Sequence, residues 1–185
     1  MSMTFEKIIE DGRLWAVRYD GETENALGNL FEQWSDVEWL RQFFKENMDD
    51  LTSYFKITDV NDAIWDTLED SDCLQCLIMD ISPEADLDKL FMPLENYRTA
   101  DMVLGMEKAR LKRTVRHSSW LRIYAIKLAD GVYIITGGAI KLTLRMDERE
   151  HTKAELAKME KVRRYLLDEN IIDDEGFVDY VNTLI

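Results

Sequence analysis

The spacing of hydrophobic residues in the first half of the chain predicts one β-hairpin followed by three helices. The pair Asp11-Gly12 is a common two-residue turn, so residues 5–19 around it are predicted to pair as a hairpin. Hydrophobic residues then recur every three or four positions, which is typical of helices that bury one face. Residues 84–107 follow neither period and are predicted to be short helical pieces and loop. The expected buried helical positions are Leu27, Leu30, Phe31 and Trp34, then Val37, Leu40, Phe44, Met48 and Leu51, then Val60, Ile64 and Leu68.

Residues 119–145 change to the two-residue period of β-strands. Two segments rich in branched and aromatic residues flank Asp130-Gly131, a turn too short for a parallel crossover, so they are predicted to be antiparallel. Gly137-Gly138 predicts a bulge or a close approach of another group to the backbone. The strands are expected over residues 120–128, 132–136 and 139–145, the last with apolar and charged residues on opposite faces.

The last part of the chain predicts a long helix and a short one. Thr152 and Glu155 fit a capping box that begins the long helix, and Asn170 can end it in the left-handed conformation. Residues 174–185 are predicted to form the short helix. No internal repeat and no Gly-, Ser- or Pro-rich linker divides the chain, so residues 1–185 are expected to form a single domain.

The formal net charge of −14 is unevenly distributed along the chain. Residues 1–100 contain 8 basic and 23 acidic side chains, whereas residues 108–164 contain 15 basic and 6 acidic ones. This asymmetry predicts two surfaces of opposite charge, of which only the basic one suits nucleic acid. No apolar run reaches the ~20 residues of a membrane span and the N-terminus lacks a signal-peptide pattern, so a cytoplasmic protein without membrane contact is expected.

Motifs for metal or cofactor chemistry are weak. Cys73 and Cys76 have the C-x-x-C spacing, but they lie in an acidic helical run, and only His117 and His151 remain to complete a zinc site. Two small side chains on a helix are therefore favoured over a redox or zinc role. The sequence contains no phosphate-binding loop, dinucleotide fingerprint or nucleophilic serine motif, so neither a metal nor a small-molecule cofactor is expected.

The basic segment offers candidate residues for binding and cleaving RNA. Phosphates bind fixed cations and bases stack on aromatic rings. Cleavage without a metal requires a base for the 2′-hydroxyl, cations for the developing charge and an acid for the leaving oxygen, and Lys, Arg, His and Tyr can supply these groups. The alternative is an ordinary sheet with charged residues on its solvent face.

The strand residues of this segment resemble the RelE/HigB toxin superfamily, especially its phage-derived branch. The likeness rests on Leu121-Arg122-Ile123-Tyr124, the Asp130-Gly131 turn, a small residue before Ile140-Lys141, and Thr143. The helix that follows is similar too. The resemblance covers residues 119–166 well and residues 14–34 loosely, whereas residues 36–115 match nothing in the family and would be an insertion.

The resemblance implies an α+β fold with a curved antiparallel sheet packed against helices, as in RelE/ParE proteins, with residues 36–115 as a helical insertion. It implies a toxin of a toxin–antitoxin pair that cuts mRNA on the ribosome by 2′-hydroxyl attack. Its implied partner is an antitoxin, for which the helix-turn-helix type is the candidate. The family's basic strand residues correspond to Arg122 and Lys141, and the other candidates follow from their place in the basic segment. The expected catalytic residues are Arg122, Tyr124, Lys141, Arg145 and His151, and the expected RNA-binding residues are Lys112, Arg113, Arg116, Lys127 and Arg149.

Two other functions fit the same sequence. The chain is long and acidic, whereas such toxins are small and basic, and Leu142 stands where the family has a second lysine. A non-catalytic interaction protein on the same scaffold, with its acidic half binding a basic partner, is the main alternative. A phage-derived remnant is the other.

Overall fold

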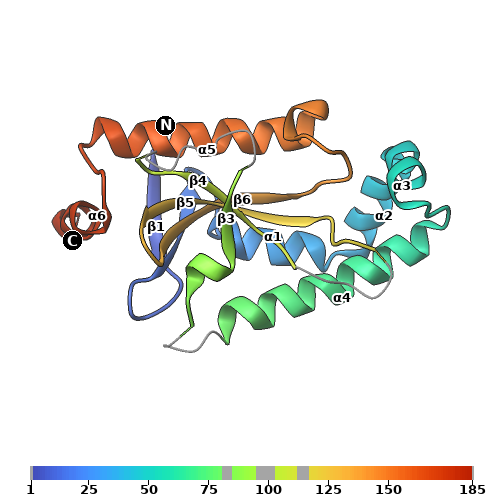
Figure 1. The fold of residues 1–185 in the computed structure, drawn as a ribbon, viewed down its shortest axis with the longest axis horizontal. Coiled ribbons are helices and arrows are strands. Elements are labelled where there is room, and N and C mark those ends of the chain that lie inside the picture. The colour runs from blue at the N-terminus through green and yellow to red at the C-terminus, as the bar shows by residue number, and fades with distance from the viewer. Residues whose placement is uncertain (1, 81–84, 95–102, 112–116, 185) are drawn as a thin grey trace.

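A computed structural model describes residues 2–80, 85–94, 103–111 and 117–184. These residues form an α+β fold in which one sheet lies between two layers of helices, as Figure 1 shows. The strands are β1 (Met3–Lys7), β2 (Leu14–Tyr19), β3 (Phe91–Pro93), β4 (Met106–Ala109), β5 (Leu121–Ala129) and β6 (Val132–Ile140), and they lie in the order β1-β2-β6-β5-β4-β3. The helices are α1 (Ala26–Trp34), α2 (Val37–Glu46), α3 (Met48–Phe55), α4 (Val60–Met79), α5 (Glu150–Asp168) and α6 (Asp174–Thr183), with short 3-10 turns η1 (Leu87–Lys89) and η3 (Met146–Glu148).

The sheet is mixed rather than wholly antiparallel. The β1–β2 hairpin and the β5–β6 hairpin are both antiparallel, as the sequence predicted. The two hairpins meet where β2 runs parallel to β6, with Leu14 opposite Tyr133 and Ala16 opposite Ile135. Four of the five strand pairs are antiparallel as predicted, and the β2–β6 pair is parallel because helices α1 to α4 separate β2 from β6 in sequence and allow a parallel crossover.

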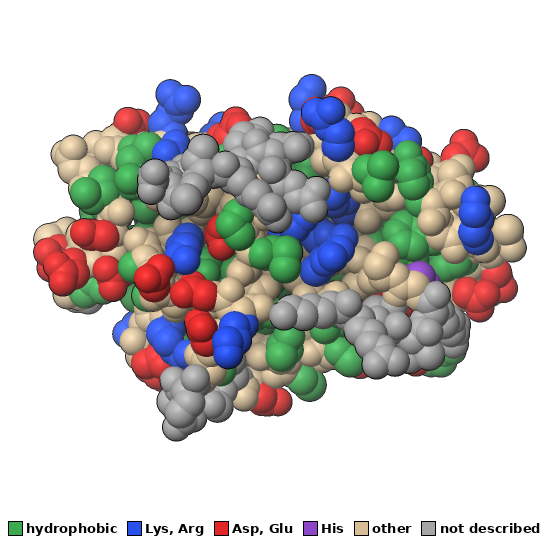
Figure 2. Space-filling model, viewed as in Figure 1, with side chains coloured by type: hydrophobic (Ala, Val, Ile, Leu, Met, Phe, Trp, Pro, Cys, Tyr) green, Lys and Arg blue, Asp and Glu red, His purple; other side chains and the backbone are tan. Residues whose placement is uncertain are grey.

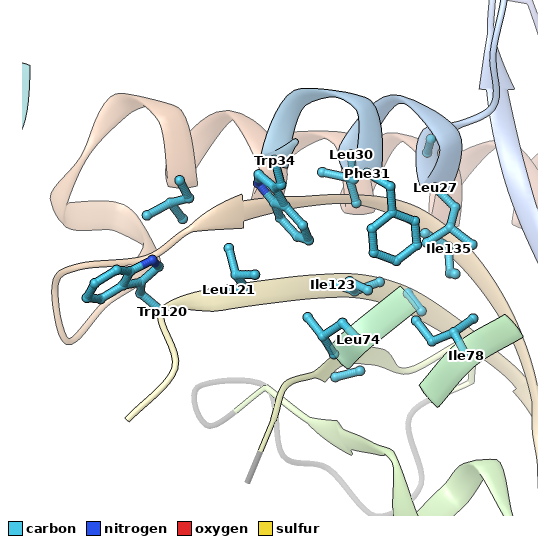
Figure 3. Close-up of a cluster of buried hydrophobic side chains, with 14 of the residues drawn as sticks. Leu27, Leu30, Phe31, Trp34, Leu74, Ile78, Trp120, Leu121, Ile123 and Ile135 are labelled. Atoms are coloured by element: carbon cyan, nitrogen blue, oxygen red, sulfur yellow. The ribbon is translucent and has the colours of Figure 1, made fainter. Parts of the chain in front are cut away.

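Hydrophobic side chains cover both faces of the sheet. Helices α1, α2 and α4 pack on one face, and α5 and α6 pack on the other. Figure 3 shows the first of these cores, where α1, α4 and the sheet meet. The residues labelled there are Leu27, Leu30, Phe31 and Trp34 of α1, Leu74 and Ile78 of α4, and Trp120, Leu121, Ile123 and Ile135 of the sheet region.

Several helix boundaries differ from the sequence prediction. The single helix expected from Val37 to Leu51 is divided at Asn47, whose side-chain amide donates to the carbonyl of Phe43 at 2.8 Å and so competes with the helical bonds. The stretch Ser35-Asp36-Val37-Glu38 predicts a capping box that begins at Ser35, but the carboxylate of Asp36 caps helix α2 instead. Thr58 is the cap that the sequence predicts for the next helix, but α4 is capped by Asp59. The two exposed cysteines of α4 form no disulfide.

Residues 84–107 contain two strands that the sequence did not predict. Strand β3 pairs with β4, and β4 pairs with β5, so this stretch extends the sheet. Strand β4 was missed because Glu107 and Lys108 lie in it, and charged residues that are buried give no alternating pattern. Residues 36–115 therefore contribute three helices and two strands among their described residues.

The separate strand expected over residues 139–145, antiparallel to residues 132–136, is not found, because residues 132–140 form the single strand β6. Strand β6 runs without a break through Gly137 and Gly138 and stops at Ile140, and the chain then turns into η3. Helix α5 begins at Glu150, two residues before the predicted cap at Thr152. The left-handed residue expected after this helix is confirmed at Asn170, whose φ is 60°. Among the described residues, no helix combines the length and apolar composition needed to cross a bilayer.

The predicted close approach is found at Gly138, and a bulge lies at Thr136, immediately before the glycine pair. Tyr124 of β5 lies opposite Gly137 and Ala125 lies opposite Ile135, so Thr136 is the extra residue of a bulge. A Cβ on Gly138 would lie 2.4 Å from the carbonyl oxygen of Arg122, which is backbone and cannot move aside. The second glycine of the pair is thus required by the packing of two strands.

We expect Gly138→Ala to lower the free energy of unfolding by about 2 kcal/mol, because the added methyl group overpacks the sheet. Gly28→Ala is the matched control. Its added methyl group would lie 3.0 Å from the flexible carboxylate of Glu24 and would favour helix α1, so stability should stay equal or rise by up to about 1 kcal/mol. Urea unfolding of both variants measures this, and equal effects would contradict the packing argument.

Candidate functional site

The structure separates the residues that the sequence grouped as one basic site. Lys112, Arg113 and Arg116 lie outside the described residues. The other seven candidates lie at four places, which are the inside of the sheet, the two ends of its central hairpin and the start of α5. Figure 2 shows basic and acidic side chains interspersed on the face in view, without a purely basic surface.

Arg122 and Tyr124 point from β5 into the layer beneath α5 and are buried. Arg122 is 7% exposed, and its Nη1 donates to the carbonyls of Ser119 at 2.6 Å and Leu121 at 3.0 Å. Burial, with a smaller contribution from the charge of Arg110, lowers the pKa of Arg122 to about 10. Because α5 covers this face, β5 presents no solvent-exposed phosphate site at these two residues.

Each of these two buried side chains has a polar atom without a hydrogen-bond partner among the described residues. Within the described part of the chain, Arg122 Nε and the hydroxyl of Tyr124 have no hydrogen-bond partner. Burial raises the pKa of Tyr124, so its hydroxyl keeps its proton. An unpaired buried hydroxyl costs free energy and does not stabilise the fold.

Lys127 and Arg149 are paired with carboxylates. Lys127 Nζ lies 3.3 Å from Asp88 and 3.3 Å from Asp130, near the turn between β5 and β6. Arg149 donates twice to Asp50 of α3, at 2.6 and 2.7 Å. Both residues therefore join elements of the protein, and their charges are offset at these contacts.

Lys141 and Arg145 follow β6 in the link to α5. Lys141 Nζ donates to the carbonyl of Leu144 at 2.8 Å, and the exposed guanidinium of Arg145 lies 2.7 Å from Asp147. Lys141 follows Ile140, the last residue of β6, whose carbonyl oxygen lies 2.8 Å from His151 Nε2, but Lys141 is not among the residues that line the groove described next.

His151 lines a groove along the half of β6 that β2 does not cover. Strand β2 pairs with β6 only at residues 133–135, and the groove lies beside residues 136–140. Its volume is about 270 Å³, and its walls come from β2, α1, α2 and α5. We call this site the β6-edge groove.

Three side chains bond the backbone of β6 where a neighbouring strand would. The hydroxyl of Tyr19 donates to the carbonyl of Thr136, and Glu155 Oε1 accepts from the N–H of Gly138 at 2.9 Å. His151 Nε2 lies 2.8 Å from the carbonyl oxygen of Ile140. Because a carbonyl can only accept, Nε2 must carry a hydrogen, and this leaves Nδ1 as the proton acceptor of the neutral ring.

A buried carboxylate and an exposed ammonium form the charged centre of the groove. Glu155 is 8% exposed, and Lys158 Nζ lies 2.8 Å from its Oε2. The same ammonium stands 5.6 Å from the ring centroid of Tyr19. Burial, and then the charge of Glu155, raise the pKa of Tyr19, so that its hydroxyl remains a donor. The groove thus holds one fixed anion and one cation that can approach a ligand.

Helix α2 lines the groove with aromatic side chains. Trp39 and Phe43 of α2 are stacked, with ring centroids 5.4 Å apart and planes inclined by 18°. The ring of His151 meets Phe43 edge-on at 5.1 Å. A flat ligand could therefore lie against an aromatic ring beside an imidazole and an ammonium group. Among the described residues, no group of three His, Cys, Asp or Glu side chains is placed to hold a metal ion.

Only His151 of this groove was a candidate from the sequence. Glu155 was assigned to a helix cap, but α5 begins earlier and turns this carboxylate toward the sheet. Gly137-Gly138 was the available signal, because a Cβ on Gly137 would lie 2.3 Å from Glu155 Oε1. Comparisons with protein-family models, with curated proteins and with solved structures each returned no match.

Two tyrosines of this region predict opposite effects of the same substitution. Tyr124→Phe removes a buried hydroxyl that has no partner among the described residues, so stability should be unchanged or up to about 1 kcal/mol higher. Tyr19→Phe removes the donor to Thr136 and should cost about 1 kcal/mol. Urea unfolding of the two variants at neutral pH gives both values, and the reverse order would refute the assigned bonding.

Proposed function

We propose that this protein is a RelE/HigB-like mRNA endoribonuclease that binds a nucleotide of its RNA in the β6-edge groove. The observation that supports this is the meeting of four groups in one groove: the His151 imidazole, the Glu155 carboxylate, the Lys158 ammonium and a stacked aromatic pair. Metal-independent RNA cleavage needs a base, a cation and a surface that orients the nucleotide.

The proposed reaction uses the RNA's own 2′-hydroxyl. His151 Nδ1 takes the proton of this hydroxyl, and its oxygen then attacks the adjacent phosphorus. The bond from phosphorus to the 5′-oxygen breaks, and this oxygen takes a proton from the ammonium of Lys158. The products are a 2′,3′-cyclic phosphate and a 5′-hydroxyl, with one proton accepted and one donated by the protein.

Each remaining group of the groove has a positioning role in this proposal. Glu155 holds Lys158 through the 2.8 Å ion pair and is itself fixed by the N–H of Gly138. The carbonyl of Ile140 fixes the tautomer of His151. Trp39 offers a face on which a base can stack, an interaction worth about 1–3 kcal/mol per base.

The proposal also defines where the RNA backbone would run. Lys141 follows Ile140, whose carbonyl contacts His151, so the proposed backbone path runs from Lys158 past His151 toward Lys141. The protein as a whole carries a charge of −14, so binding must be local and should weaken as salt increases. We propose mRNA on the ribosome as the substrate and an antitoxin as the partner, both on the strength of the resemblance.

Lys158→Ala should lower translation-dependent mRNA cleavage at least tenfold, because the cation nearest the reacting phosphate is lost. Lys161→Ala is the matched control, since it removes the same charge from an exposed position one turn further along α5. Primer extension on mRNA from a translating extract measures the cleavage. Equal losses in both variants, or no cleavage by the wild type, would contradict the proposal.

A second candidate function is supported by the acidic layer of helices. Residues 22–80 contain 15 acidic and 3 basic side chains, a net charge of −12. Trp65 of α4 is 65% exposed in this layer, and exposed tryptophans are common anchors of protein interfaces. This combination supports binding of a basic protein. Binding of an arginine-rich peptide that weakens at least tenfold in Trp65→Ala, but not in Leu77→Ala on the same helix, would identify this role.

A further inference from the structure

A second cavity lies at the other end of β6, around the turn that joins it to β5. Its volume is about 390 Å³. Most of the residues that line it are apolar or aromatic, and they include Phe91 of β3, which stacks on Tyr133 of β6 with ring centroids 4.4 Å apart. Four charged residues also line it, namely Asp88 of η1, Glu107 of β4, Lys127 of β5 and Asp130 of the turn between β5 and β6.

Asp88 is an ionised carboxylate held by several donors. It accepts from the N–H of Gly131 at 2.9 Å and from the hydroxyl of Tyr133, and Lys127 Nζ lies 3.3 Å away. Burial alone would raise the pKa of Asp88, but these donors together lower it. Asp88 and Lys127 therefore offset each other, and Asp130 adds a second carboxylate at 3.3 Å from the same ammonium.

Glu107 is the unusual member of this cavity. It is only 5% exposed, yet within the described chain no hydrogen bond or ion pair is formed by its carboxyl group. Burial raises the pKa of Glu107 to about 7. The charge of Lys127 lowers this pKa and the charge of Asp88 raises it, but both effects are smaller than that of burial. A carboxyl group that lines a cavity without a donor lacks the partner that would make its charge stable.

The charge of the cavity wall indicates the kind of partner that is missing. With Glu107 ionised, three carboxylates face one ammonium, so the wall has a net charge of −2. This balance favours a cation. The apolar lining suits a carbon skeleton, and among the described residues no three side chains are placed to hold a metal ion.

We infer that this cavity binds a small organic cation, with its guanidinium or primary ammonium group paired to the carboxylate of Glu107. The aromatic and aliphatic wall around Phe91 and Tyr133 would take the apolar part of the ligand. The inference is independent of the RNA chemistry proposed for the β6-edge groove, which lies at the opposite end of β6.

Binding of a cation should depend on pH near neutrality. A bound cation favours ionised Glu107, so binding releases a proton where the free protein holds this carboxyl partly protonated, and affinity should rise from pH 6 to pH 8. The other titratable groups of the cavity wall are Asp88, Lys127, Asp130 and Tyr133, and the charge of Asp86 acts on Tyr133. The pKa values of Lys127 and Tyr133 are raised, so these two groups keep their protons over this range.

Isothermal titration calorimetry with n-butylguanidinium tests the inference. Its neutral analogue n-butylurea has nearly the same shape and should bind at least tenfold more weakly. Glu107→Gln should weaken binding of the cation at least tenfold, whereas Glu69→Gln, which removes an acidic group from the exposed face of α4, should leave it unchanged. Titrations at pH 7 in phosphate and in Tris should show proton release, because the two buffers differ in ionisation enthalpy.

Three results would overturn the inference. These are no binding of n-butylguanidinium at millimolar concentration, equal affinity for n-butylurea, and full affinity in a Glu107→Gln variant whose urea unfolding shows that it is folded. If Glu107→Gln does not fold, the wild-type titrations decide the question. Proton release and rising affinity with pH support a cation at Glu107, and their absence refutes it.

Discussion

The fold depends on how the backbone N–H and carbonyl groups of β6 find hydrogen-bond partners along the half of the strand that β2 does not pair with. Strand β2 covers β6 only as far as Ile135, and beyond this point backbone groups at the edge of a central strand need other partners. The bond from the N–H of Gly138 to Glu155 supplies one of them and fixes α5 on the sheet. Tyr19 and His151 bond the neighbouring carbonyls. Because side chains replace a strand here, a groove remains where that strand would lie.

The same constraint explains the two glycines and the position of the chemistry. Gly137 leaves room for the carboxylate of Glu155 in its observed position beside β6, and Gly138 fits closely against the backbone of β5. The ion pair to Lys158 then offsets the charge of a carboxylate that is largely withdrawn from water. A structural need of the sheet edge thus brings an acid, an imidazole and an ammonium to one accessible place, and this supports the proposed RNA site.

Helices cover both faces of the sheet, and this determines where the basic side chains of its strands can lie. A charged side chain on β5 must be buried or reach a carboxylate at the end of the strand. Arg122 is buried, whereas Lys127 reaches the carboxylate of Asp88 at the end of the strand. Among the described residues, the basic side chains of β5 therefore do not form an exposed basic face.

Local patterns were sufficient for the elements whose signals are local. Both hairpins, helix α1 and the glycine pair were predicted, because turn residues and periodicity specify them directly. The parallel contact of β2 with β6 was not, since it depends on segments more than a hundred residues apart. Strand β4 was hidden by Glu107 and Lys108, which are charged but buried. In the groove, Glu155 was missed because its partner is a backbone group on another element.

Photo-crosslinking of a bound oligonucleotide tests most directly whether the β6-edge groove is the nucleotide site. A short RNA with a single 4-thiouridine would be irradiated with the protein at low salt, and the modified peptide would be identified by mass spectrometry. We expect crosslinks at Trp39, Phe43 or His151, the aromatic wall of the groove. Crosslinks confined to residues 141–149, or an RNA that crosslinks nowhere on this wall, would contradict the account.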